Sequence, residues 1–302
     1  KKGVESIGFV LDETVEASAD NIKALLAGVD ITSTEINFST KKCMKSLASA
    51  LLEAVMQMGV DPTKVKGSID FDPAGKLILK GKTCKTIDEI MDSAAEIVKN
   101  GKALPSFQWI NVNGKIFGNS GSTIVQELAF ALSAANEYLA KLTERGLTVD
   151  EVAGSIRFTL SIGPVYFMEI AKLRAGRMLW SNIVSAYKPA STAAARMNVH
   201  CETSEFNMTV FDPYVNLLRT QTEAMSATLG GCHSLLVQPF DKPFRKAGEF
   251  SERIARNQQL LLKEESYFGK VADPGAGSYY IENLTESIAN EAWKLFVEVE
   301  SK

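Results

Sequence analysis

Short runs of apolar and β-branched residues alternate with long helical patterns from one end of the chain to the other. Seven such runs can be counted, near residues 4–11, 34–38, 65–71, 107–112, 156–160, 193–200 and 232–237. Most are runs of apolar or β-branched residues rather than strict alternations, which is typical of strands covered on both faces. Strands that alternate with helices favour βα units around a parallel sheet. The pattern therefore predicts an α/β fold.

The number of βα units favours a barrel. A (β/α)8 TIM barrel has eight strands and uses about 250 residues, so 302 residues are enough for one. Because seven runs are one too few, we expect the first strand to lie upstream of Lys1. No low-complexity tract, repeat or Pro/Ser-rich linker divides the chain. We therefore expect one barrel domain over residues 1–302, incomplete at its N-terminal end.

Three helices can be predicted with their ends. Asp212 precedes Pro213 and two glycines follow Leu229, which predicts a capped helix over residues 213–229. An apolar stripe over residues 124–142 predicts a helix that faces the core. A last amphipathic helix covers residues 284–299, with Asn283 or Thr285 as its cap.

Composition excludes several classes of function. Hydrophobic residues make up 45% of the chain and charged residues 23%, as in an ordinary globular protein. A formal net charge of −3 without a long basic run argues against a nucleic-acid partner. No segment approaches the roughly 18 consecutive apolar residues of a membrane span. We expect no membrane partner and a cytoplasmic location, although a targeting signal upstream stays open.

The four cysteines are far apart and form no C-x-x-C pair. This spacing predicts reduced thiols in a cytosolic chain, without a disulfide or a zinc site. They are Cys43, Cys84, Cys201 and Cys232.

His200 and His233 are the only histidines, and both fall at ends of predicted strands, where a barrel keeps its active site. Each can line a functional pocket or make a structural hydrogen bond. Glu202 lies two residues beyond His200, an arrangement that suits a base with its orienting carboxylate. No third ligand has a recognisable spacing, so we expect no metal site.

Three further motifs have both a functional and a structural interpretation. Asp70 and Asp72 can act as paired carboxylates, but a turn or helix cap is favoured by the Pro-Ala-Gly-Lys segment that follows. The glycines at 114, 118 and 121 resemble a phosphate loop only superficially, because their spacing is not G-x-G-x-x-G. Arg174 and Arg177 can hold an anion, although a surface or interface role is favoured.

Several long segments resemble the methylmalonyl-CoA mutase family. They include MEIAKLRAGRMLW at 168–180, HCETS at 200–204, FDPYVN at 211–216, EAMSA at 223–227, RIARNQQ at 253–259, EES at 264–266 and VADPGAGSY at 271–279. The resemblance is fainter before residue 156. It implies a (β/α)8 barrel that threads coenzyme A along its axis, followed by a separate cobalamin-binding domain. The implied reaction is the radical interconversion of methylmalonyl-CoA and succinyl-CoA with adenosylcobalamin.

This chain departs from the family at the positions that carry the chemistry. Ile116 stands in the place of the family's His that bonds the thioester, and Asp70 in the place of its substrate-binding Gln. Asn198 aligns with an Arg that helps to hold coenzyme A, and Leu236 with a His that faces cobalamin. The Arg that clamps the substrate carboxylate has no counterpart near residues 75–80. Neither histidine follows an Asp by two residues, so the cobalt-ligating motif is absent too.

The resemblance and these departures predict a non-catalytic small subunit of a heterodimeric mutase. Its partner would be a homologous large catalytic subunit, which binds the coenzyme A ester and adenosylcobalamin, and no cofactor is expected on this chain. An alternative is a catalytic mutase for an uncharged acyl chain, and a third is an unrelated barrel enzyme that uses His200 and Glu202. The expected vestigial pocket consists of Asp70, Gly114, Ile116, Asn198, His200, Ser204 and His233.

Overall fold

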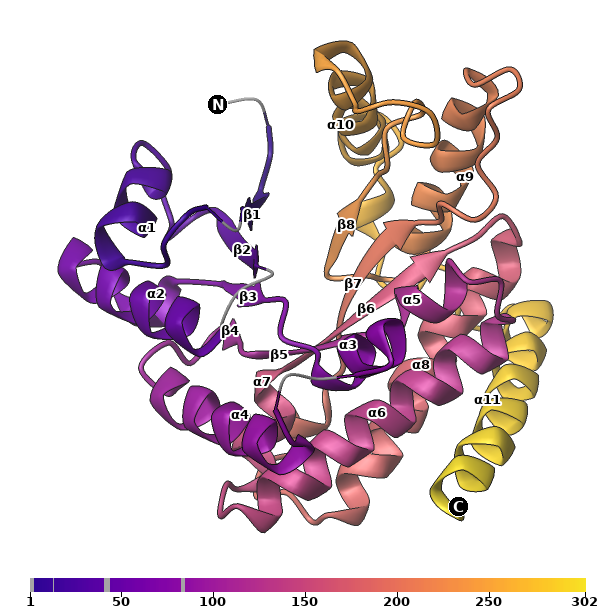
Figure 1. The fold of residues 1–302 in the computed structure, drawn as a ribbon. Helices are drawn as coiled ribbons and strands as arrows, with labels where there is room; N and C mark the ends of the chain where they lie inside the picture. Colours follow the sequence, from indigo (N-terminus) through magenta and orange to yellow (C-terminus); the bar gives the residue numbers. More distant parts are fainter. Residues whose placement is uncertain (1–2, 13, 41–43, 83–84) are drawn as a thin grey trace. The chain divides into compact units, whose positions relative to one another are not determined.

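A computed structural model of the chain describes residues 3–12, 14–40, 44–82 and 85–302, drawn in Figure 1. The chain forms two compact units. The first unit comprises Lys1–Val112, Ala135–Arg157 and Tyr187–Ala195, and the second comprises Asn113–Ala134, Phe158–Ala186 and Arg196–Lys302. Each unit is described by itself.

A four-stranded parallel sheet forms the centre of the first unit. Its strands follow the order β1-β2-β3-β4, and all three pairings are parallel. Buried side chains on these strands include Ile36, Phe38, Ile69 and Phe107. The strands are β1 (Ser6–Leu11), β2 (Glu35–Thr40), β3 (Gly67–Ile69) and β4 (Phe107–Gln108).

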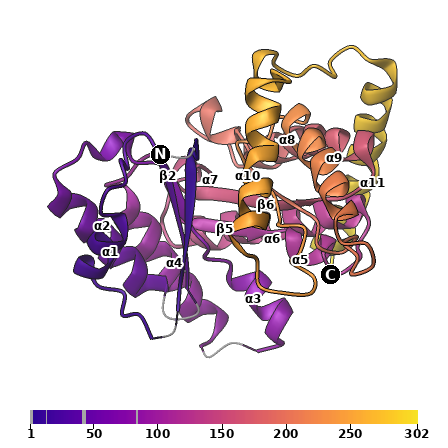
Figure 2. The ribbon, with the colours of Figure 1, turned by 90° about the horizontal axis from the view of Figure 1, so that it is seen from above.

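The helices of the first unit are capped by side chains that the sequence places one residue before them. Ser18, Asp72, Thr86 and Thr148 accept backbone N–H groups at the starts of four helices. Helices α1 and α2 lie side by side, as Figures 1 and 2 show. The elements are α1 (Ala19–Leu26), α2 (Met44–Met58), α3 (Pro73–Lys80), α4 (Ile87–Gly101), α7 (Val149–Ser155) and the 3₁₀ turns Pro62–Lys64 and Thr192–Ala195.

The second sheet has the strand order β5-β6-β7-β8. Strands β7 and β8 run parallel, with His200 opposite Ser234 and Glu202 opposite Leu236. Every residue of β6 is buried, as expected for a strand covered on both faces. The strands are β5 (Ile110–Asn113), β6 (Ile156–Ile162), β7 (Asn198–Thr203) and β8 (Ser234–Leu236).

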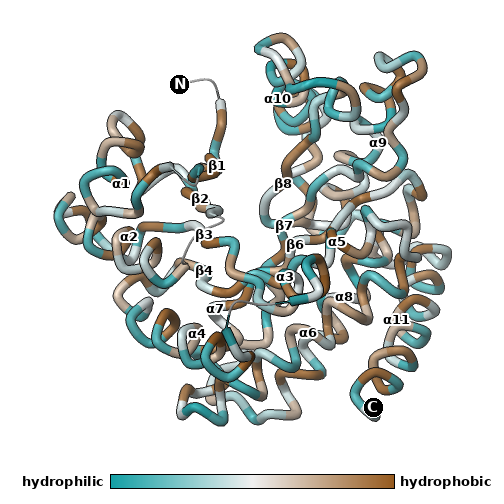
Figure 3. Tube along the Cα trace, viewed as in Figure 1, coloured by the Kyte–Doolittle hydropathy of each residue, from teal (hydrophilic) through white to brown (hydrophobic). Residues whose placement is uncertain are grey.

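Long helices accompany the strands of the second unit. Helix α11 packs against α8, and Figure 3 shows hydrophilic and hydrophobic residues interspersed along α11, as in an amphipathic helix. Among the described residues, no helix combines the length and the apolarity needed to cross a membrane. The elements are α5 (Lys115–Gly118), α6 (Ile124–Glu144, of which residues 124–134 belong to this unit), α8 (Tyr166–Ala186), α9 (Val215–Leu229), α10 (Glu249–Glu264), the 3₁₀ turn Phe268–Lys270 and α11 (Tyr279–Glu300).

All seven predicted runs contain strand residues, which confirms the α/β class. The fourth run divides at Trp109 into β4 and β5, which belong to different sheets. The backbone N–H of Trp109 donates to Ser155 O at 2.9 Å, and its indole donates to Gly101 O at 3.2 Å. The first part of the sixth run is a 3₁₀ turn, and β7 begins later, at Asn198. The helix predicted over residues 124–142 is confirmed as α6.

Two predicted helix starts are wrong. Helix α9 begins at Val215, because Asp212 has a φ of 46° and Asn216 instead holds the preceding loop, accepting from Thr209 N at 3.1 Å and donating to Phe240 O at 3.0 Å. Helix α11 begins at Tyr279, so Asn283 and Thr285 lie inside it. The hydrogen bonds of Asn216 to Thr209 and Phe240 could not be inferred from local spacing.

The reciprocal cap of α7 provides a test of these local signals. Glu151 N donates to Thr148 Oγ1 at 3.3 Å, and Thr148 N donates to Glu151 Oε2 at 3.0 Å. Thr148→Ala is expected to lower the free energy of unfolding by about 1 kcal/mol, because the backbone N–H of Glu151 loses its side-chain acceptor. Urea denaturation measures the change. Thr148→Ser keeps the hydroxyl and should stay close to the parent, and equal losses in both variants would refute the role of the cap.

Candidate functional site

The residues of the expected pocket fall in both units. Asp70 belongs to the first unit. The others belong to the second unit and are Gly114, Ile116, Asn198, His200, Ser204 and His233.

Asp70 is exposed directly after β3 and is held by neutral donors. Its Oδ1 accepts from Asn111 Nδ2 at 2.7 Å, and its Oδ2 accepts from Ser39 Oγ at 3.2 Å. Asp72 has different partners: it caps α3 by accepting from Gly75 N at 3.0 Å, and the hydroxyl of Tyr138 donates to it. The cap interpretation of Asp72 is therefore confirmed, and Asp70 presents a carboxylate beside amide and hydroxyl groups.

A buried polar layer in the first unit was not found by sequence reasoning. The guanidinium of Arg157, on β6, donates to Asn37 and Ser68, and lies 3.4 Å from Glu35 Oε1. Ser68 Oγ donates to Asn37 Oδ1 at 2.7 Å. The spacing of two between Glu35 and Asn37 on β2 was a usable signal, because alternate residues of a strand share a face.

Gly114 and Ile116 belong to the turn between β5 and α6. A Cβ added at Gly114 would lie 2.7 Å from Leu160 Cδ2, so close packing requires glycine here. This contact supports the tight turn rather than a phosphate loop. Ile116 lies on α5 and is half-buried, and its backbone O accepts from Ser120 Oγ at 2.7 Å. Its side chain can neither donate nor accept a hydrogen bond.

A charged cluster lies along β7 of the second unit. Lys115 Nζ is 2.8 Å from Glu202 Oε2, and Gln238 Nε2 donates to the same oxygen at 2.9 Å. His200 Nε2 is 3.8 Å from Glu202 Oε1, and its Nδ1 is 2.8 Å from Ser234 Oγ. The expected neighbourhood of His200 and Glu202 is therefore confirmed. Lys115 and Gln238 were missed, because 87 residues separate Lys115 from Glu202.

His233 and Asn198 lie elsewhere on the strands. His233 precedes the amino end of β8, is exposed, and accepts the Val199 backbone N–H on Nδ1 at 3.1 Å. Asn198 begins β7 at its amino end. The predicted strand-end positions of the two histidines are wrong. His200 is inside β7, because this strand continues to Thr203, and His233 comes before β8, because that strand begins at Ser234. That either histidine lines a pocket stays a prediction.

Ser204 is buried at the carboxyl end of β7. Its backbone N donates to Ile162 O at 2.9 Å, and its Oγ accepts from Phe206 N at 3.1 Å. Asn119, which ends α5, accepts from Glu205 N at 3.1 Å. The helix that carries Ile116 is thus fastened to the strand end that carries Ser204.

Lys172 lies wholly buried between two buried carboxylates. Its Nζ is 2.7 Å from Glu127 Oε2, 2.7 Å from Glu169 Oε2 and 2.6 Å from Ser161 O. Burial opposes the charged lysine, but the two carboxylates outweigh it and raise the pKa of Lys172. Burial raises the pKa of Glu169, whose Oε1 accepts from Gly163 N at 2.8 Å. The cluster fixes the carboxyl end of β6.

The two arginines of the 168–180 segment have structural partners. Arg174 pairs with Glu282 at 2.9 Å and with Asp273 at 3.1 Å, which joins α8 to α11. Arg177 Nη1 donates to Gly230 O at 2.8 Å. The structural interpretation of both residues is therefore confirmed.

Two of the four cysteines are described, and both are free thiols. A hydrogen bond from Cys201 and the nearby Arg177 outweigh burial and hold the pKa of the Cys232 thiol below its usual value, whereas burial raises that of Cys201. Cys43 and Cys84 lie outside the described residues.

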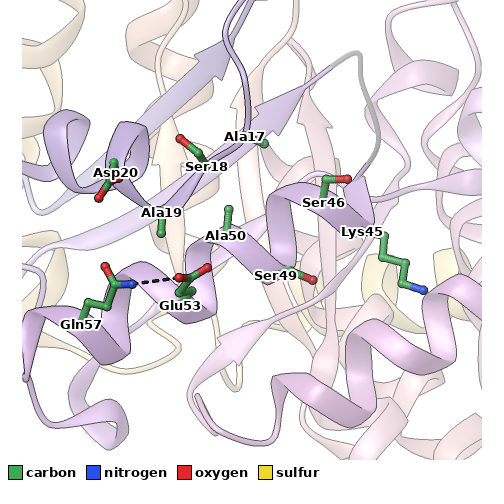
Figure 4. A pocket seen from close by; sticks show the side chains of 10 residues that line it. All are labelled: Ala17, Ser18, Ala19, Asp20, Lys45, Ser46, Ser49, Ala50, Glu53 and Gln57. Carbon is green, nitrogen blue, oxygen red and sulfur yellow. Dashed lines mark hydrogen bonds between the residues drawn. The ribbon is translucent and has the colours of Figure 1, made fainter.

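The first unit also has an open groove of about 550 Å³ between α1 and α2. Figure 4 shows its serines together with Asp20, Lys45, Glu53 and Gln57. Gln57 donates to Glu53 Oε1 at 2.9 Å, Asp20 pairs with Lys23, and Lys45 pairs with Glu96. Because Asp20, Lys45 and Glu53 already have partners within the first unit, we assign this groove no ligand.

Two sheets whose strands alternate along the chain with helices define an α/β protein with a TIM-barrel-like order of elements. The methylmalonyl-CoA mutase family profile matches residues 12–302, and the chain belongs to this family.

Curated relatives agree with this assignment. The methylmalonyl-CoA mutase small subunit of Porphyromonas gingivalis is 47% identical over 99% of this chain and 48% of its own length. The methylmalonyl-CoA mutase of Rhizobium meliloti is 37% identical over 94% of this chain and 40% of its own. The human mitochondrial methylmalonyl-CoA mutase is 32% identical over 99% of this chain and 40% of its own length. The chain spans less than half the length of these relatives.

Proposed function

We propose that this chain is the non-catalytic small subunit of a heterodimeric, adenosylcobalamin-dependent methylmalonyl-CoA mutase. The proposal depends chiefly on Ile116, which occupies the α5 position where the family resemblance places a hydrogen-bonding His. An isoleucine cannot stabilise the charge that develops on a thioester oxygen. The high identity to a relative named as a small subunit supports the proposal. We further propose that the chain forms one (β/α)8 barrel domain in the cytoplasm.

Asp70 adds an electrostatic argument. Its carboxylate is exposed and is held by two neutral donors, Asn111 and Ser39. The substrate that the family resemblance implies carries a carboxylate of its own, and like charges repel. A position that carries Gln in catalytic chains would therefore disfavour this substrate when it carries Asp.

The histidines of this chain do not fit the family's cobalamin-ligating motif. Asn198 and Gly231 occupy the positions two residues before them, where the motif has Asp. His200 Nδ1 lies 2.8 Å from Ser234 Oγ, and His233 Nδ1 accepts a backbone N–H. We therefore propose that adenosylcobalamin, which supplies the radical, is bound by a homologous large catalytic subunit together with the coenzyme A ester. Association with that partner would stabilise both chains by mass action.

The decisive assay compares full-length protein alone with the reconstituted pair. Full-length protein, adenosylcobalamin and succinyl-CoA are expected to give no methylmalonyl-CoA, and addition of the large subunit to give turnover and a one-to-one complex in light scattering. Ile116→His combined with Asp70→Gln should leave the isolated chain inactive, because the cobalamin motif is still missing. Turnover by the unmodified isolated chain would refute the proposal.

A catalytic role toward an uncharged acyl chain is the second candidate. It is favoured by the apolar α5, where Phe117 contacts Phe130 with ring centroids 5.2 Å apart. A branched, uncharged acyl-CoA such as isobutyryl-CoA would then raise the melting temperature of the isolated full-length chain and be converted when adenosylcobalamin is added. No stabilisation and no conversion would eliminate this candidate.

A further inference from the structure

Glu223 of α9 is a buried carboxyl group with only one satisfied oxygen. The residue is 1% exposed, and its Oε1 accepts from Asn207 Nδ2 at 2.6 Å. Its Oε2 is buried without a hydrogen-bond partner among the described residues, and so is Oδ1 of Asn207. Both atoms are acceptors when Glu223 is ionised, and two buried acceptors without a donor are unfavourable.

The charged groups around Glu223 do not neutralise it. Arg219 on the same helix donates from Nη1 to Asn216 Oδ1 at 3.0 Å. Lys172 on α8 lies between Glu127 and Glu169, at 2.7 Å from each. Glu169 adds negative charge, and Glu205 on the facing loop lies 3.8 Å from Lys242. An ionised Glu223 would therefore be a buried negative charge near another carboxylate.

We propose that Glu223 is held in its acid form and that its Oε2–H donates to Oδ1 of Asn207, completing a cyclic acid–amide pair between α9 and the loop after β7. One proton then satisfies both orphaned acceptors, and each residue donates once and accepts once. Burial raises the pKa of Glu223 to about 8, and Glu169 adds to this shift, whereas the amide of Asn207, the backbone N–H of Ser204 and the charge of Arg219 oppose it.

The acid–amide pair holds the loop between β7 and α9 against α9 only while Glu223 is protonated, and we call this pH-sensitive contact the latch. The loop carries the exposed side chains Phe206 and Phe211, which are 64% and 85% accessible, and Asn207 lies between them. Loss of the proton replaces a hydrogen bond by two facing lone pairs, so the loop is released as the pH rises. Glu223 also interacts with the backbone N–H of Ser204, but the latch acts on the loop and requires no turnover.

Infrared spectroscopy of the full-length protein tests the protonation. A carboxylic-acid C=O band is expected at pH 7, lost with a midpoint near pH 8, and absent in Glu223→Gln. Glu286→Gln, an exposed position on α11, is the matched control and should keep the band. The same spectrum in wild type and Glu223→Gln at pH 7 would overturn the proposal.

Limited chymotrypsin digestion tests the latch. If one proton leaves per opening event, cleavage after Phe206 or Phe211 should rise about tenfold per pH unit below pH 8 and level off above it. Rates are normalised to an unstructured peptide, and the protein is digested alone and in complex with its partner. Glu223→Gln can still donate through its amide, so its cleavage should not depend on pH. Wild-type cleavage that is also independent of pH would overturn the latch.

Discussion

Lys172→Met is expected to lower the free energy of unfolding by about 3–5 kcal/mol, because it leaves two buried carboxylates without their cation. In the native chain, Lys172 Nζ lies 2.7 Å from an oxygen of both Glu127 and Glu169, and donates to Ser161 O at 2.6 Å. Methionine has nearly the same length but cannot donate. Denaturant unfolding at neutral pH measures the loss.

Two further variants separate charge from packing. Lys294→Met removes an exposed partner of Glu291 on α11 and should change stability by less than about 0.5 kcal/mol. A triple variant, Lys172→Met with Glu127→Gln and Glu169→Gln, should recover part of the loss, because no buried charge then lacks a partner. If Lys172→Met were as stable as Lys294→Met, the buried network would not support the fold.

The pH dependence of the free energy of unfolding is expected to reveal the raised pKa of Glu223. Its folded pKa of about 8 exceeds the ordinary glutamate pKa of 4.5, so the folded state keeps a proton that the unfolded state has lost. Stability therefore falls as the pH rises from about 4.5 to about 8 and is level above that. A shift of this size corresponds to about 4–5 kcal/mol in total, since one pKa unit is about 1.4 kcal/mol.

The difference between wild type and Glu223→Gln isolates this contribution. Other groups titrate equally in both proteins, so the variant should gain stability relative to wild type with increasing pH, by about 3 kcal/mol at pH 7. Unfolding curves at half-unit pH intervals measure it, with Glu286→Gln as the control. A stability difference that does not change between pH 5 and pH 8 would contradict the raised pKa.

The elements of the fold could be predicted well because each depends on local composition. The apolar side chains of Ile156, Phe158 and Leu160 favour burial wherever this segment lies, and β6 is there. The ends of elements were harder to predict. Asp212 before Pro213 has the sequence of a helix cap, yet the distant contact from Asn216 to Phe240 shapes that loop differently.

The residues of the candidate site also differ in how far the sequence could predict them. Sequence resemblance identified Ile116 and Asp70 as departures, because it needs only aligned positions. The partners that decide what these regions do are remote: Lys115 lies 87 residues from Glu202, and Arg157 lies 89 from Ser68. No spacing rule links residues so far apart.

The sequence by itself determined the α/β class and the family, because these follow from composition and from recognisable motifs, and it predicts the loss of the family's polar residues at Asp70 and Ile116. Only the tertiary structure decided the partners of Lys172, the orphaned oxygen of Glu223 and the ion pair of Lys115. The physical reason is that burial and charge pairing are properties of the surroundings, which are assembled from segments far apart in the chain.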